Sequence, residues 1–237
     1  MLKICYLLFF TAAVGWTGCS YRYYADDLQP LSEAEQGENK EVADDGSVTY
    51  NQARLAITLR PMTDEELNRQ FSAYSNEGAE SRNPYTFGNS EYFHTGDTPK
   101  RWTIFRLNVS NYEYPKVFLD PDALVIRSAN NRVYEALDQG LLEDYFSPYL
   151  RAYAGTQRRA YEAITDQLVR TVYPPDMVFS GQETAGYIVF PTLHNDVDAF
   201  SVQISDVAIR FDYKGEPVET IDLEYKFDRE IYMALQP

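Results

Sequence analysis

The sequence predicts a mostly β protein, an antiparallel β-sandwich with a helical insertion at about residues 147–172. About seven short segments alternate apolar and polar residues, as strands with one wet face do. One longer segment between the middle strands has apolar residues three and four apart, as an amphipathic helix does. The hydrophobic fraction of 44% is ordinary for a globular domain and allows a sizeable core.

The first half of the folded region contains several predicted strands. In residues 53–59, Leu55, Ile57 and Leu59 lie on one face, and residues 105–111 alternate in the same way. Two shorter strands follow, at residues 116–119 and 123–127. The turn between them contains a proline, which lacks the N–H of a sheet interior.

A short helix is predicted after the first strand. Thr63 and Glu66 match a capping box, in which each side chain bonds the other residue's backbone N–H. Leu67 and Phe71 then share one helix face. Residues 75–100 show no clear period, and connections of this length are usually functional or disordered.

The helical insertion shows three agreeing signals. Ser147 suits the N-cap, Pro148 suits the first helical position, and the double proline at 174–175 ends the helix. The apolar stripe consists of Tyr149, Tyr153, Ala160, Tyr161, Ile164, Leu168 and Val172. We expect this stripe to pack on the sandwich, which leaves the face with Arg158 and Arg159 free for a partner.

The C-terminal region returns to strands. A strand is predicted at residues 187–190. Apolar residues then alternate with polar ones over 200–204, and over 207–213 the apolar residues change from even to odd positions. Since a one-residue shift turns side chains to the opposite face, a bulge or turn is needed near Ser205 and Asp206. A turn and a last strand complete the pattern, at residues 214–217 and 221–227.

The strand order over residues 101–228 resembles that of the immunoglobulin-like domains of many small exported lipoproteins. The resemblance is carried by a strand ending near Asn111, a later strand from Gly186 to Phe190 and the closing strands. It implies an immunoglobulin-like antiparallel β-sandwich, with the helical insertion between its strands. Residues 49–237 are predicted to form this single domain. The paired cysteines of antibody domains are absent, and such a fold implies little about function.

The first eighteen residues differ from the rest of the chain. Lys3 precedes an almost unbroken apolar run at residues 4–14. As a helix this run would span about 17 Å, less than the roughly 30 Å of a bilayer core, so it fits a signal peptide and not a membrane span. No other apolar run in the sequence is long enough to cross a bilayer.

The run ends in GWTGC at residues 15–19, which resembles the lipobox of bacterial lipoproteins. The resemblance implies diacylglycerol on the thiol of Cys19, removal of the signal peptide 1–18 and acylation of the new amino group. Because Ser20 and not aspartate follows, it also implies sorting to the outer membrane, with the protein facing the periplasm. The alternative is an ordinary secretory signal cut near Gly18, which leaves Cys19 as a free thiol.

The mature chain is strongly acidic. Loss of Lys3 with the signal leaves 20 basic against 36 acidic residues, a formal net charge of −16. Phosphate backbones repel such a chain, so no nucleic-acid partner is expected. Cys5 lies in the signal, so the mature chain cannot form an internal disulfide.

Residues 19–48 are predicted to be an acidic, disordered tether, because they contain too few apolar side chains to order themselves. A flexible coil of this length would hold the folded part about 30 Å from the lipid. The carboxylates of the segment are those of Asp26, Asp27, Glu33, Glu35, Glu38, Glu41, Asp44 and Asp45. The fold is expected to begin near Ala53.

No sequence motif indicates catalysis or a cofactor. His94 and His194 lie in no catalytic or metal-binding spacing, and no Walker, G-x-S-x-G or G-x-G-x-x-G motif occurs. Two acidic clusters could bind calcium, or could simply be turns: Asp120 with Asp122, and Asp196 with Asp198. No metal ligand or cofactor is therefore assigned.

Two functions remain open. The twenty tyrosines favour a recognition surface, since tyrosine combines apolar area with a polar tip. The first hypothesis is therefore a non-enzymatic binding or assembly module, anchored by Cys19, that binds an envelope protein or polymer. The alternative is a hydrolase or carbohydrate-active enzyme whose carboxylates come from distant parts of the chain.

Overall fold

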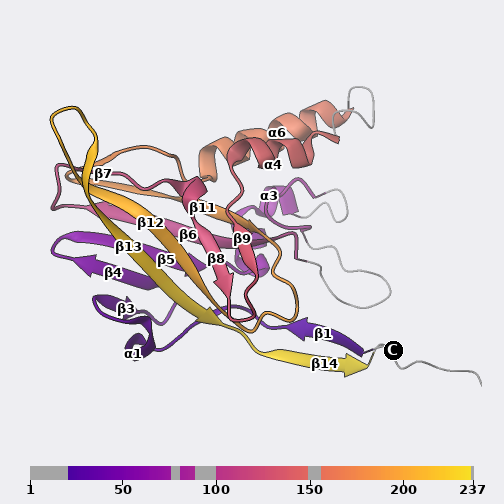
Figure 1. Cartoon of the computed structure of the whole chain (residues 1–237). Helices are drawn as coiled ribbons and strands as arrows, with labels where there is room; N and C mark the ends of the chain where they lie inside the picture. The colour runs from indigo at the N-terminus through magenta and orange to yellow at the C-terminus, as the bar shows by residue number, and fades with distance from the viewer. Residues whose placement is uncertain (1–20, 76–80, 89–99, 149–155, 236–237) are drawn as a thin grey trace, which may run out of the picture.

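Two five-stranded antiparallel sheets face each other and enclose the main core (Figure 1). The computed structural model describes residues 21–75, 81–88, 100–148 and 156–235. Sheet 1 has the order β11 (Gln182–Pro191), β6 (Trp102–Asn111), β5 (Leu55–Pro61), β4 (Val48–Gln52) and β3 (Lys40–Val42). Sheet 2 has the order β2 (Gln29–Pro30), β13 (Pro217–Asp228), β12 (Ala199–Phe211), β8 (Val125–Ser128) and β9 (Val133–Glu135). The predicted mostly β sandwich is confirmed.

The described residues also form two short ribbons. One pairs β7 (Lys116–Val117) with β10 (Val178–Phe179). The other pairs β1 (Tyr21–Ala25) with β14 (Ile231–Leu235), so the first and last strands lie side by side. Figure 1 shows this second ribbon at the end of the molecule opposite the turn between β12 and β13.

The alternating residues of β5 fill the core, as the sequence predicts. Leu55, Ile57 and Leu59 are fully buried, whereas the residues between them are only half-buried. Across the core, Phe105 of β6 packs on Phe227 of β13 with ring centroids 5.2 Å apart. The two sheets therefore contact each other directly through large side chains.

The predicted irregularity near Ser205 and Asp206 is confirmed. The pairing of β12 with β13 shifts register between Ile204 and Val207. Asp206 has a positive φ of 57°, and its backbone N–H donates to Asp222 Oδ1 at 2.9 Å. The bulge thus turns both halves of β12 toward the same core.

A layer of helices covers one end of the outer face of sheet 1 (Figure 1). Its helices are α2 (Asp64–Gln70), α3 (Ser72–Ser75), α4 (Gln139–Phe146) and α6 (Thr156–Thr171). The expected capping box of Thr63 and Glu66 begins α2. Ile164 and Leu168 of α6 are buried in a second core that includes Tyr187 of β11, so this part of the predicted stripe does pack on the sandwich.

The helical insertion begins before its predicted start at Ser147, although Pro148 is helical, as predicted. Asp138 caps an earlier helix, α4, by accepting a hydrogen bond from Leu141 N–H at 2.7 Å. Ser147 is the C-cap of α4, with its N–H donating to the Asp144 carbonyl at 3.1 Å. The insertion therefore begins earlier than expected, while residues 149–155 lie outside the described part. Among the described residues, no helix has the length and apolarity to cross a membrane.

The prediction of a disordered tether over residues 19–48 is wrong for its described part. From Tyr21 onward the segment forms β1, β2, a short helix α1 (Glu33–Gln36), β3 and the start of β4. Backbone pairing with other strands orders it, and Gln36 fastens it to β13. The Gln36 side chain donates to the Lys226 carbonyl at 2.6 Å and accepts from the Lys226 N–H at 3.0 Å. The ordered domain thus begins well before Ala53.

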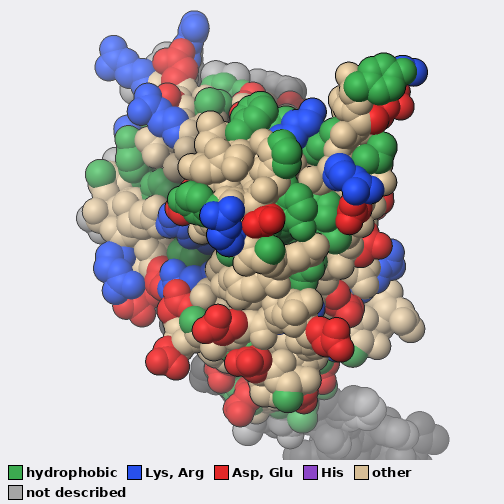
Figure 2. Space-filling model, turned by 90° about the vertical axis from the view of Figure 1, so that its left-hand side faces the viewer, with side chains coloured by type: hydrophobic (Ala, Val, Ile, Leu, Met, Phe, Trp, Pro, Cys, Tyr) green, Lys and Arg blue, Asp and Glu red, His purple; other side chains and the backbone are tan. Residues whose placement is uncertain are grey.

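The carboxylates of this segment remain in solvent although its backbone is ordered. Those of α1, β3 and the turn to β4 belong to Glu33, Glu35, Glu38, Glu41, Asp44 and Asp45, all exposed. Figure 2 shows acidic side chains gathered over the lower part of one face, the end at which α1 and β3 lie in Figure 1. Acidic composition alone therefore gave the wrong prediction, because exposed charges cost little on a well-paired backbone.

Candidate functional site

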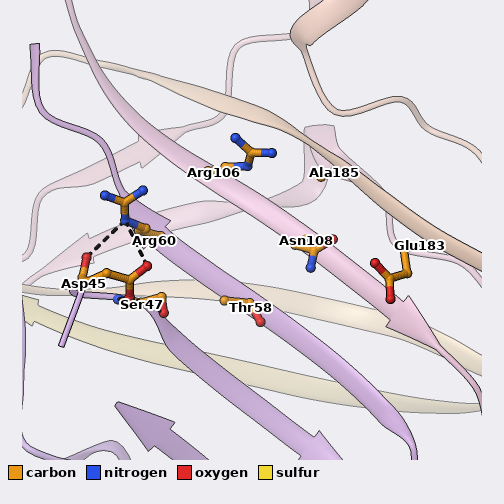
Figure 3. Close-up of a pocket in the computed structure, with 8 residues that line it drawn as sticks. All are labelled: Asp45, Ser47, Thr58, Arg60, Arg106, Asn108, Glu183 and Ala185. Atoms are coloured by element: carbon orange, nitrogen blue, oxygen red, sulfur yellow. Dashed lines mark hydrogen bonds and ion pairs between the residues drawn. The ribbon is translucent and has the colours of Figure 1, made fainter. Parts of the chain in front are cut away.

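An open polar trough lies on the outer face of sheet 1, beside the part that the helices cover (Figure 3). Its volume is about 430 Å³. Outward-facing residues of three neighbouring strands form its floor, and the turn before β4 supplies one wall. The lining residues are Asp45, Ser47, Thr58, Arg60, Arg106, Asn108, Glu183 and Ala185.

Two arginines face each other across adjacent strands of the trough. Arg60 of β5 and Arg106 of β6 are direct partners in the antiparallel register, so their side chains lie on the same face. Like charges placed directly opposite each other destabilise a sheet. In a chain with 36 acidic and 21 basic residues, this pairing of two cations requires an explanation.

The charge of Arg60 is neutralised within the protein. Its guanidinium forms ion pairs with Glu66 of α2 and, at 3.5 Å, with Asp45. The hydrogen bond from the Ser47 hydroxyl, and then the charge of Arg60, hold the pKa of Asp45 below its usual range. Asp45 is therefore a fixed anion whose role is to hold Arg60.

The charge of Arg106 is not neutralised in the same way. Within the described part of the chain, Arg106 forms no hydrogen bond or ion pair, and its side chain is exposed. Glu183 of β11, which also lines the trough, accepts a hydrogen bond from the Tyr112 hydroxyl at 2.8 Å. Figure 3 shows Asn108 between Arg106 and Glu183. The trough thus offers an available cation, an amide and a carboxylate in a row.

The second open surface, on the outer face of sheet 2, has a volume of about 400 Å³. Its polar side chains already bond one another. Arg127 donates to Gln203 at 2.8 Å, and Lys226 donates to the Glu35 carbonyl at 3.0 Å. The trough on sheet 1 is therefore the better candidate for binding a ligand.

A third pocket, of about 20 Å³, lies beside the start of α2 and leaves room for about one water molecule. Burial raises the pKa of Asp64 in this pocket to about 6, although the charge of Lys100 opposes the shift. A carboxyl group with this pKa could act as an acid, but this pocket is too small to admit a sugar or a peptide.

Replacing Asp64 with Asn is expected to change how stability depends on pH. Because the folded-state pKa is raised from 3.8 to about 6, the folded protein retains a proton that the unfolded chain releases, so stability falls as pH rises through this window. The buried charge costs about 2 to 3 kcal/mol above pH 6. Since Asn loses a favourable contact with the helix N-terminus, Asp64→Asn should gain about 1 to 2 kcal/mol near pH 7.5 and nothing near pH 4.

Urea midpoints at the two pH values would measure this difference. Glu65→Gln is the matched control, because Glu65 is the next residue of α2 and is exposed. It should shift stability by less than about 0.5 kcal/mol at either pH. An equal response of the two variants would contradict the burial of the Asp64 charge.

The residues singled out in the sequence that the structure describes are not brought together. Cys19 and His94 lie outside the described residues, whereas His194 bonds the Tyr134 hydroxyl at 2.8 Å. Asp120 caps a 3₁₀ helix, η2 (Pro121–Ala123), and accepts from Asp122 N–H at 3.1 Å.

The second acidic cluster is also engaged locally. Asp196 pairs with Arg132 at 2.7 Å, a hydrogen bond that lowers the pKa of Asp196, and Asp198 accepts from Ala199 N–H at 2.7 Å. Among the described residues, no three His, Cys, Asp or Glu side chains gather as a metal site would require. These acidic residues therefore serve as caps and turn residues in the structure.

Sequence reasoning missed the trough because its residues come from four separate segments. The usable signal was the wet face of residues 105–111, which carries Arg106 and Asn108. The tyrosines proved less informative. Tyr85 is fully buried, while Tyr145 packs on Trp102 with ring centroids 4.6 Å apart.

No protein-family model matches the chain, and comparisons with curated proteins and with solved structures find no significant similarity.

Proposed function

We propose that the protein is a lipid-anchored, non-enzymatic binding module of the cell envelope, and that the trough on sheet 1 binds an acidic group of a polar envelope polymer or protein. One observation carries this proposal: Arg60 and Arg106 oppose each other, and only Arg60 is neutralised by described carboxylates. An anionic ligand on Arg106 would relieve the repulsion and form charge-assisted hydrogen bonds. Asn108 and Glu183 would orient the rest of the ligand.

The state of the trough carboxylates favours binding over hydrolysis. A glycoside hydrolase needs one carboxyl group that can donate a proton and a second that acts as base or nucleophile. Asp45 cannot serve as the acid, because its pKa is lowered and it is paired with Arg60. The carboxyl group with a pKa suited to an acid, Asp64, lies in a separate small pocket.

The proposed location depends on the N-terminal sequence. The GWTGC segment at residues 15–19 supports lipid on Cys19, and Ser20 supports sorting to the outer membrane. The protein would then face the periplasm. The comparison with immunoglobulin-like lipoprotein domains stays a prediction at the level of strand order.

Inorganic phosphate is a suitable probe of the trough. It should raise the thermal midpoint of the wild-type protein relative to chloride at equal ionic strength, because phosphate at tenfold its Kd adds about 1.4 kcal/mol to the free energy of unfolding. Arg106→Ala should lose this stabilisation by phosphate, because the guanidinium that would bind phosphate through two hydrogen bonds is removed. Arg106→Ala should also be about 0.2 to 1 kcal/mol more stable than wild type without phosphate, because the repulsion from Arg60 is removed.

Arg127→Ala is the matched control, since Arg127 lies on the outer face of sheet 2. It should retain the full response to phosphate. General salting effects of phosphate would raise all three midpoints alike, and that result would overturn the proposed anion site.

Cys19→Ser is expected to abolish lipid labelling and membrane retention while leaving the fold intact. The reason is that lipid on Cys19 is the anchor that this proposal assigns, and no other apolar run in the sequence is long enough to cross a bilayer. Fractionation of cells that express the two forms, with metabolic labelling by a radioactive fatty acid, would measure both effects. If the variant still sedimented with the membrane, the proposed anchor would be wrong.

A further inference from the structure

The ribbon of β1 and β14 is set apart from the two large sheets. It forms a separate two-stranded sheet, with Tyr23 opposite Met233 and Tyr24 opposite Tyr232. Figure 1 shows it extending at the lower right of the molecule. An isolated two-stranded ribbon is only marginally stable in water, so a ribbon of this kind needs a further surface to pack on.

Within the described residues, the hydrogen bonds of the ribbon run mainly between its own two strands. At its base, Asp26 N–H donates to the Glu230 carbonyl at 3.0 Å and extends this ladder. From the body of the domain, Asn195 Nδ2 donates to the Tyr23 carbonyl at 2.7 Å.

The ribbon exposes large apolar side chains. Tyr23 is 50% exposed, Tyr232 50% and Met233 59%. Because directly opposite residues of an antiparallel pair point to the same side, Tyr23 and Met233 form one continuous patch. On the other side, Tyr24 stacks on Tyr232 with ring centroids 5.6 Å apart. Both faces of the ribbon thus present apolar area to solvent.

The composition of the ribbon also differs from that of the chain. Its two strands, YRYYA and IYMAL, contain no carboxylate, although the chain has 36 acidic residues. Tyrosine concentrates where a bilayer meets water, because its ring prefers the apolar side and its hydroxyl the wet side. An acid-free ribbon also avoids repulsion by anionic lipid head groups.

The covalent distance to the proposed lipid anchor is short. Only Ser20 separates Cys19 from Tyr21, where β1 begins. Two residues span at most about 7 Å, roughly the thickness of one head-group layer. A disordered tether would have allowed the domain to stand away from the membrane, but the ordered start of β1 does not.

We propose that the ribbon of β1 and β14 lies in the interface of the bilayer that holds the lipid of Cys19, and that it orients the domain on the membrane. This inference rests on the proposed lipidation of Cys19. The ribbon then packs on lipid through Tyr23 and Met233. The turn between β12 and β13, at the opposite end of the molecule, is directed away from the membrane (Figure 1).

Single engineered thiols provide the test, since Cys19 is the only cysteine of the mature chain and lipid occupies its thiol in the proposed form. Tyr23→Cys and Met233→Cys would each carry an environment-sensitive nitrobenzoxadiazole label in the lipidated full-length mature protein. Tyr213→Cys is the control, because Tyr213 lies beside the distant turn and is 92% exposed. The protein would be placed in vesicles of phosphatidylethanolamine and phosphatidylglycerol.

Labels at positions 23 and 233 should show blue-shifted emission and strong quenching by spin-labelled lipid, whereas the label at 213 should show neither. If the labels at 23 and 233 behave like that at 213, or are shielded from water without quenching by lipid, the inference is overturned. The second outcome would point to a protein or a second copy of the chain on the ribbon. Retention through Cys19 is measured separately by Cys19→Ser, so the anchor can hold while the ribbon inference fails.

Discussion

Ile164→Ala and Leu168→Ala are each expected to lower the free energy of unfolding by about 2 to 5 kcal/mol, the usual cost of emptying a core site. Both side chains are completely or almost completely buried, at 1% and 0% exposure. They join α6 to Tyr187 and Val189 of β11 in the second core. Denaturant midpoints of the purified variants would measure the loss.

Arg158→Ala and Arg159→Ala are the matched controls on the same helix. Arg158 and Arg159 are exposed, and Arg158 pairs with Glu162 at 2.8 Å. A surface pair of this kind contributes about 0.3 to 0.5 kcal/mol, so both variants should stay within about 0.5 kcal/mol of wild type. If the alanine variants of the stripe unfolded no more easily than these two, α6 would not be docked on sheet 1.

The core of the sandwich could be predicted because period-two alternation reports directly on burial. The alternation of apolar residues over 55–59 predicted the inward face of β5. The change in this alternation near Asp206 predicted the bulge of β12. The capping box of Thr63 and Glu66 was equally local and located the start of α2. Signals of this kind need no knowledge of distant segments.

The N-terminal segment could not be predicted because tertiary pairing orders it. Its few apolar residues suggested disorder, yet β1 pairs with β14 from the far end of the chain. Gln36 lies in this segment but is buried, and the nitrogen and oxygen of its side-chain amide both bond the backbone of Lys226. The amino-acid composition of a segment indicates how much apolar surface the segment can bury. It does not reveal whether distant parts of the chain will pair with its backbone.

Helix α4 and the trough were not predicted, for a related reason. Ser147 followed by Pro148 satisfies the rule for an N-cap, but Asp138 satisfies it too, and Leu142 and Phe146 follow it at helical spacing in the second core. The trough depends on register, because Arg106 meets Arg60 only once β5 and β6 are paired. Neither the helix boundary nor the register of β5 with β6 could be predicted from local sequence alone.

Gly186→Ala is expected to destabilise the protein by about 2 to 3 kcal/mol, at the upper end of the usual cost of overpacking. The chain that leaves α6 crosses β11 at this residue, where Tyr173 N–H donates to the Tyr187 carbonyl at 3.0 Å. A Cβ on residue 186 would lie 2.3 Å from Tyr173 Cα and 2.8 Å from the Val172 carbonyl carbon. Because these are backbone atoms, the whole crossing segment must move.

The movement would also reach the helix layer, because Val172 follows α6 directly and packs against the second core. Gly140→Ala is the control: Gly140 is exposed in α4, and its added Cβ would meet a side-chain oxygen, that of Asp138, at 3.1 Å, and no backbone atom of another segment. That variant should be neutral or up to about 1 kcal/mol more stable, since alanine favours helix. Equal urea midpoints for the two alanine variants would show that the chain after α6 does not approach β11 this closely.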